Sequence, residues 1–135
     1  MIEYLKRNIY NLQRTFQKAQ EAEDQDKCTN LCRIFTELAE ILLQPICNMP
    51  GEGLGDLTTV NLVMDGLSHY DWEVSRITFN FWYGLCESLH QNESTVDKFR
   101  YMFEKLIQAL TRLCQVKKFL KSYIYLAGKT SPSSL

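Results

Sequence analysis

The sequence predicts an all-α fold in which helical hairpins stack side by side. Apolar residues recur at spacings of three and four along most of the chain, which is the period of amphipathic helices. Pro and Gly concentrate between Pro45 and Gly55, so long loops are not expected elsewhere. A chain of 135 residues that is 45% hydrophobic can bury one core, and we therefore expect one structural unit.

The first predicted helix runs from the amino terminus to Glu21, where an acidic cluster interrupts the apolar pattern. The apolar stripe of this helix is formed by Ile2, Leu5, Ile9, Leu12, Phe16 and Ala19. The spacing also fits a short coiled coil. Because the pattern ends at Glu21, an ordinary packed helix is favoured.

The second predicted helix begins at Asp24, whose carboxylate can accept the free backbone N–H groups of a first helical turn. Its apolar positions are Cys28, Leu31, Cys32, Phe35, Leu38, Ala39, Leu42 and Ile46. Pro45 has no backbone N–H group to donate, so the helix should end near it.

Three further helices follow a predicted loop at residues 48–55. Asp56 is placed to cap the third helix, and a turn at residues 69–71 separates it from the fourth. The fourth helix has a stripe formed by Val74, Ile77, Phe81, Leu85 and Leu89. Ser94 and Asp97 have the spacing of a capping box, which would open a fifth helix.

The rhythm of the loops favours stacked hairpins over a closed bundle, because the loop between helix pairs is longer than the turns inside them. We expect hairpins at residues 1–47 and 56–90, a partial repeat at 94–114, a basic amphipathic segment at 115–127 and a disordered tail at 128–135. A stack of about two and a half hairpins leaves an apolar face uncovered. A cap formed by the first helix or by the basic segment, and self-association, both remain open.

Composition excludes several classes of partner. The net charge of −1 gives no global attraction to nucleic acid, and no apolar run is long enough for membrane insertion. The five cysteines are an odd number at mostly apolar helical positions, which indicates a reducing compartment.

Catalytic and metal-binding patterns are weak. With only two histidines, His69 and His90, the chain has little from which to build a nucleophile and its base, so we do not expect an enzyme. Cys28 with Cys32, and Cys86 with His90, have the spacing of metal half-sites. Neither has a second half-site with short ligand spacing, so no metal and no cofactor are expected.

Charge is unevenly distributed along the chain. Between Ile34 and Ser75 there are seven acidic residues and no Lys or Arg. The acidic residues are Glu37, Glu40, Glu52, Asp56, Asp65, Asp71 and Glu73. Such a surface would attract a basic partner at short range, or would only keep the chain soluble.

Several segments carry a family resemblance. The stretch Tyr70-Asp71-Trp72-Glu73-Val74-Ser75-Arg76-Ile77 resembles the start of the inner helix in HEAT repeats. Together with the segments at residues 31–40, 53–57 and 77–83, it is similar to the transportin-SR and importin-13-like branch of the β-karyopherins, in the importin-β superfamily. The resemblance runs from Asp24 to Cys114.

This resemblance implies a right-handed α-α superhelix, a HEAT- or ARM-like solenoid. It also implies a nuclear import receptor of cytoplasm and nucleus, with cargo that is basic or arginine-serine-rich, such as splicing factors. The family works with the GTPase Ran, but its Ran-binding region and the arginine-rich helix that reads cargo have no counterpart here. After Cys114 the sequence departs from the family, which predicts a partial or truncated product.

Candidate contact residues follow from the expected stacking, because the second helix of each HEAT hairpin lines the concave side. They are Arg33, Glu37, Glu40, Arg76, Asn80, Tyr83 and Glu87. The alternative is a structural spacer that sets the curvature of a solenoid while other repeats bind cargo.

Overall fold

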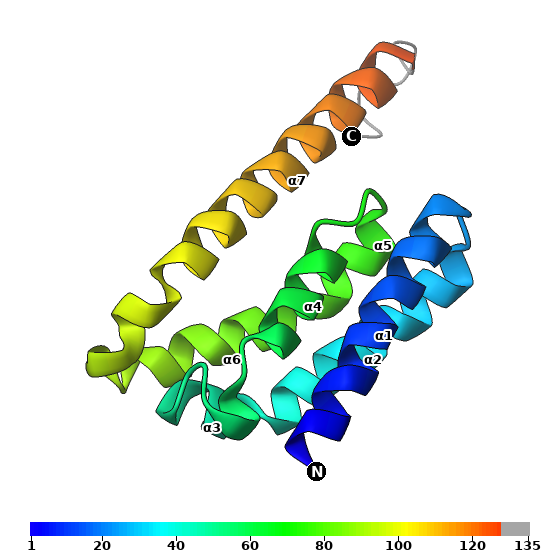
Figure 1. Ribbon diagram of the computed structural model, residues 1–135. Coiled ribbons are helices and arrows are strands. Elements are labelled where there is room, and N and C mark those ends of the chain that lie inside the picture. The colour runs from blue at the N-terminus through cyan, green and yellow to red at the C-terminus, as the bar shows by residue number, and fades with distance from the viewer. Residues whose placement is uncertain (128–135) are drawn as a thin grey trace. The chain divides into compact units, whose positions relative to one another are not determined.

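The computed structural model describes residues 1–127; the predicted disordered tail at 128–135 lies outside the described residues. Every regular element in the described range is an α-helix or a 3-10 helix, which confirms the all-α prediction. The chain divides into two compact units, Met1–Arg100 and Tyr101–Leu135, where length had suggested one. The helical core described below belongs to the first unit (Figure 1).

The first hairpin consists of α1 (Ile2–Glu21) and α2 (Gln25–Ile41). Asp24 is the N-cap of α2, and its side chain accepts the backbone N–H of Lys27 at 3.1 Å, as predicted. Just before it, Glu23 has a left-handed backbone with φ of 55°. The chain therefore reverses direction within a few residues, by means of one strained residue and one cap.

Pro45 does not end the helical segment, and that prediction is wrong. The helix α2 ends at Ile41, and a short helix α3 (Leu43–Asn48) follows after Leu42. Pro45 lies in the first turn of α3, where backbone N–H groups have no helical acceptor, so its missing N–H costs nothing there.

The second hairpin begins after a 3-10 turn at Gly53–Gly55 and consists of α4 (Thr58–Leu67) and a second arm in three parts. The parts of that arm are α5 (Trp72–Ser75), a 3-10 segment at Arg76–Thr78 and α6 (Phe79–His90). Asp56 accepts the backbone N–H of Thr58, the first residue of α4, at 2.7 Å, but the N-cap of α4 is Leu57, so the predicted cap lies one residue too early.

The two hairpins pack against each other through α4. This helix contacts α1 and α2 on one side and the second arm of its own hairpin on the other, and α2 also contacts α6. Most of α4 is buried as a result, including Val60, Leu62, Val63 and Leu67 at 0% exposure. The helices approach closely at Gly66, where an added Cβ would lie 2.6 Å from the sulfur of Cys32.

The predicted capping box at Ser94 and Asp97 is wrong. Both residues lie inside a 3-10 helix (Glu93–Phe99), and α7 (Arg100–Ala127) begins only afterwards. The Asp97 carboxylate instead pairs with the guanidinium of Arg100 at 3.2 Å. Because α7 is continuous, residues 100–114 and the predicted basic segment at 115–127 share one helix, and a capping role for that segment stays a prediction.

Candidate protein-binding surface

The exposed face of α2 carries the first three candidate residues. Arg33, Glu37 and Glu40 are all exposed and lie four and three residues apart, so they share one side of the helix. The opposite side of α2 holds Cys32, Phe35 and Ala39, each at 0% exposure. Core packing on one side thus fixes the direction in which the polar side chains project.

The second arm of the second hairpin carries the other four candidates. Arg76, Asn80, Tyr83 and Glu87 are exposed and follow one another at helical spacing. Arg76 pairs with the carboxylate of Glu73 at 2.9 Å. The phenol of Tyr83 donates a hydrogen bond to Glu87 at 3.1 Å, which raises the pKa of Tyr83.

These two stripes come from neighbouring elements, since α2 contacts both α6 and the 3-10 segment that contains Arg76. Arg76 is paired with Glu73, while no ion pair among the described residues involves Arg33, so the stripes keep one positive charge beside the carboxylates of Glu37, Glu40 and Glu87. Carboxylates, an amide and a phenol can make charge-assisted hydrogen bonds and ring contacts to a cationic partner. That these seven residues bind a partner stays a prediction.

Part of the acidic stretch has partners inside the chain. The carboxylate of Asp56 lies 3.1 Å from the ammonium of Lys6 on α1, and Gln13 of α1 donates to Asp65 at 3.1 Å. Burial alone would raise the pKa of Asp56, but hydrogen bonds from Thr58 and Lys6 outweigh it and lower the pKa. Asp71 caps α5. Within the described residues no ion pair involves Glu37 or Glu40, so these two side chains remain the acidic groups of α2 best placed for a partner.

A match to a known family model covers most of these helices. Residues 23–112 match a family model described as the second TPR domain of transportin-3 and importin-13. The match spans α2, both arms of the second hairpin and the first part of α7. The chain belongs to the transportin-3/importin-13 family. TPR and HEAT repeats are both stacked helical hairpins, so the match and the predicted all-α repeat agree.

Three of the five cysteines of this family member are buried, and Cys86 and Cys114 are exposed. Cys28, Cys32 and Cys47 are buried, and burial raises the pKa of the Cys32 thiol to about 11. The sulfur of Cys32 donates to the carbonyl of Val74 at 3.5 Å. In the part of the chain that the structure describes, no three His, Cys, Asp or Glu side chains are grouped to hold a metal ion.

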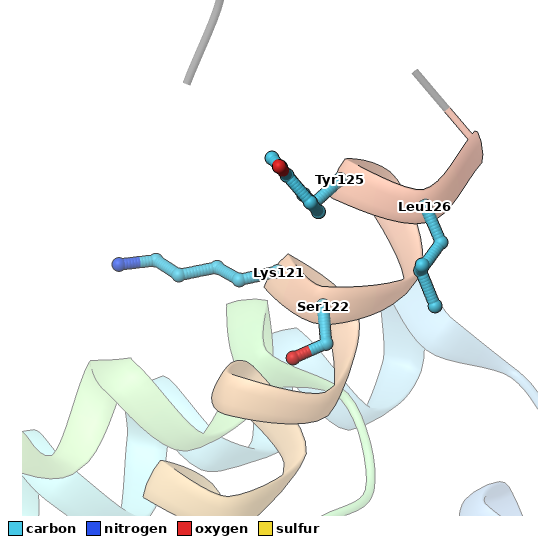
Figure 2. Close-up of a pocket in the computed structure, with 4 residues that line it drawn as sticks. All are labelled: Lys121, Ser122, Tyr125 and Leu126. Carbon is cyan, nitrogen blue, oxygen red and sulfur yellow. The ribbon is translucent and has the colours of Figure 1, made fainter. Parts of the chain in front are cut away.

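The transportin-3/importin-13 domain has a hollow of about 510 Å³ beside the last turns of α7. Its described lining comes from Lys121, Ser122, Tyr125 and Leu126 (Figure 2). All four belong to one helix and bring a single charge, so the described lining does not provide the converging polar groups of a ligand site. Among the described helices, none combines the length and hydropathy needed to cross a bilayer.

One buried polar side chain was missed by reasoning from the sequence of this family member. His69 was placed in a turn, which is right, but it is only 1% exposed and its Nε2 has no hydrogen-bond partner among the described residues. The one signal in the sequence was its position between two apolar helices, and this does not distinguish a buried turn from an exposed one.

Proposed function

We propose that this chain is the protein-binding part of a nuclear import receptor, in which the exposed faces of α2 and α6 contact cargo. The match of residues 23–112 to the transportin-3/importin-13 family carries the proposal, because it covers both of these helices. The proposed cargo is basic or arginine-serine-rich protein, such as splicing factors. The proposed compartments are the cytoplasm and the nucleus.

The chemistry of the stripes supports a cationic cargo. Glu37 and Glu40 on α2 and Glu87 on α6 are exposed carboxylates, and arginine binds carboxylates through two parallel hydrogen bonds. Tyr83, at 68% exposure, offers an aromatic face on which a guanidinium can stack. Many such weak contacts, spread over two helices, suit an extended segment better than a small molecule.

The proposal involves no catalysis by the chain. Its two histidines lie in different surroundings: His69 is buried in the α4–α5 corner, and His90 is exposed at the end of α6. Among the described residues, neither imidazole ring has a hydrogen bond to a hydroxyl or thiol that it could activate. In this proposal, the Ran-binding region belongs to the full-length receptors of the family, and no Ran site is proposed on this chain.

A binding titration with a labelled arginine-serine repeat peptide tests the proposal. The charge-reversal variant Glu37→Lys, Glu40→Lys and Glu87→Lys removes the three carboxylates of the stripes. At roughly 0.5–1 kcal/mol for each exposed ion pair, the affinity should fall at least about tenfold. The loss should shrink as salt is added, because exposed charges are screened.

The matched control is a triple variant with the same change in net charge at other exposed positions: Glu21→Lys, Glu52→Lys and Glu93→Lys. It should bind the peptide almost as well as the natural chain does. Circular dichroism should show that both variants stay helical. If the natural chain does not bind, or if the two variants lose affinity equally, the stripes are not the cargo surface and a spacer role is supported.

A further inference from the structure

His69 occupies the corner between α4 and α5 and is almost completely buried. Its Nδ1 accepts the backbone N–H of Asp71 at 3.0 Å, so in the neutral ring the proton is on Nε2. The backbone carbonyl of His69 accepts the hydroxyl of Ser75 at 2.9 Å. Ring and backbone are therefore both fixed, while Nε2 stays unpartnered within the described residues.

The imidazole is also part of a row of aromatic rings that joins the two hairpins. Phe35 of α2 packs edge-on against Phe16 of α1, with ring centroids 5.6 Å apart. Phe16 lies 6.0 Å from His69, and His69 stacks on Tyr70 at 4.2 Å. Three elements of the first and second hairpins thus meet at this histidine.

The electrostatic surroundings of His69 contain little that could stabilise a positive charge. On α1, the neighbours of Phe16 one turn away are uncharged: Leu12, Gln13, Ala19 and Gln20. Glu73 of α5 is paired with Arg76. Glu23 of the α1–α2 corner and Cys28 of α2 interact electrostatically with Tyr70, where they raise the pKa of the phenol. Burial lowers the pKa of His69, and the nearby Asp71 only partly offsets this.

We propose that His69 is a proton-sensitive latch: the neutral ring closes the joint between the two hairpins, and a proton from solvent opens it. Protonation of Nδ1 turns the acceptor of the Asp71 N–H into a donor, so that hydrogen bond is lost. The charged ring must also leave its apolar site. Since α2 and α6 belong to different hairpins, the latch regulates the surface proposed above, and in that sense it rests on the proposed function.

The direction of the pH effect follows from the lowered pKa. The unfolded chain binds a proton at His69 near the ordinary histidine pKa of about 6.5, whereas the folded chain binds it only at lower pH. The stabilisation is therefore fully present above that pH and is lost progressively as the pH falls below it. Between the folded and unfolded pKa values of His69, the equilibrium constant for unfolding should rise by up to about tenfold for each unit by which the pH is lowered.

Urea unfolding of the full chain between pH 5.5 and 7.5 tests the latch, with the exposed His90 as a matched control. His90→Asn should keep the pH dependence of the natural chain. His69→Asn supplies an amide oxygen for the Asp71 N–H but cannot titrate, so its stability should change little over this range. A flat profile for the natural chain, or an unchanged slope in His69→Asn, would overturn the proposal.

NMR titration of the His69 imidazole in the natural chain gives a test that needs no variant to fold. His69 should keep the neutral Nε2–H form to a pH below the ordinary histidine pKa of about 6.5. Hydrogen exchange at residues 68–76, corrected for intrinsic rates, should speed up as His69 becomes protonated. A His69 that titrates at or above the ordinary histidine pKa would refute the latch. Because no cargo is present, these outcomes are independent of the binding titration.

Discussion

The two corners that reverse the chain inside the two hairpins do the same task with different means. The α1–α2 corner is exposed and uses Glu23 in a left-handed conformation, followed by the cap Asp24. The α4–α5 corner is partly buried and uses His69 together with the cap Asp71. Only the cap is common to both.

The difference shows what position in a helical stack demands. At the exposed corner the backbone N–H groups of residues 22–25 all reach backbone carbonyls, so a cap and one strained residue are enough. At the corner packed against the other hairpin, side chains complete the pairing: the ring of His69 accepts a backbone N–H, and Ser75 donates to a backbone carbonyl.

The largest effect should come from Leu67→Ala, at the end of α4 beside the buried corner. Leu67 is 0% exposed, so the variant leaves a cavity and should lower the free energy of unfolding by about 2–5 kcal/mol. Urea denaturation measures the loss. Ile41→Ala, at the end of α2 with 77% exposure, should change stability by less than about 0.5 kcal/mol. Equal losses would contradict the difference in burial.

A smaller effect is expected for Ser75→Ala. The Ser75 hydroxyl reaches the carbonyls of His69 at 2.9 Å and Asp71 at 3.2 Å, and its loss leaves the buried His69 carbonyl without this donor. The free energy of unfolding should fall by about 1–3 kcal/mol. The exposed Ser68, on the other side of the same corner, is the control and should tolerate alanine. A tolerated Ser75→Ala would show that the corner does not depend on internal hydrogen bonds.

Removal of either cap should lower the free energy of unfolding by a similar amount, because a cap is the feature that the two corners share. Asp24→Ala and Asp71→Ala each remove an acceptor for a first-turn N–H group, and each should lower the free energy of unfolding by about 1 kcal/mol. Asp24→Asn and Asp71→Asn keep an acceptor oxygen and should remain close to the natural stability. Thermal melts can resolve the four variants. If only one of the two alanine variants lost stability, the two corners would differ in their dependence on the cap as well.

The smallest effect, and the only gain, is expected for Glu23→Gly. Glycine adopts the observed φ of 55° without strain, but it has more freedom to lose on folding, so the net gain should be about 0.5 kcal/mol. Glu21→Gly, in the last turn of α1, should be destabilising because it introduces glycine into a helix. A loss of stability in Glu23→Gly would mean that the carboxylate contributes more than the strain costs.

Much of the helical pattern could be predicted from the sequence because it depends on local rules. Asp24 caps α2 as its position predicts, and Asp56 accepts the N–H of the first residue of α4 from one position before the N-cap. Pro45 and Ser94 misled the prediction because each motif fits two contexts. Proline is excluded from helix interiors but not from first turns, and a serine three residues before an acid also fits a 3-10 helix.

The candidate surface could be predicted only as a set of helix faces. Residues such as Glu37 and Tyr83 are exposed because apolar neighbours at helical spacing are buried, and this is readable from the sequence. Which acids are neutralised was not readable, because Lys6 meets Asp56 from a distant part of the chain. The burial of His69 was hidden for the same reason: it depends on Phe16, in the other hairpin.

The close approach of Gly66 to Cys32 places a buried thiol at the seam, the contact of α2 with α4 and α5, so its chemical reactivity reports on how often the seam opens. The Cys32 sulfur is sealed between α2, α4 and α5, whereas the thiols of Cys86 and Cys114 are exposed. A thiol reagent should therefore modify the exposed pair at once, and Cys32 only as often as the seam opens. The rate at which Cys32 reacts counts those openings without any engineered label.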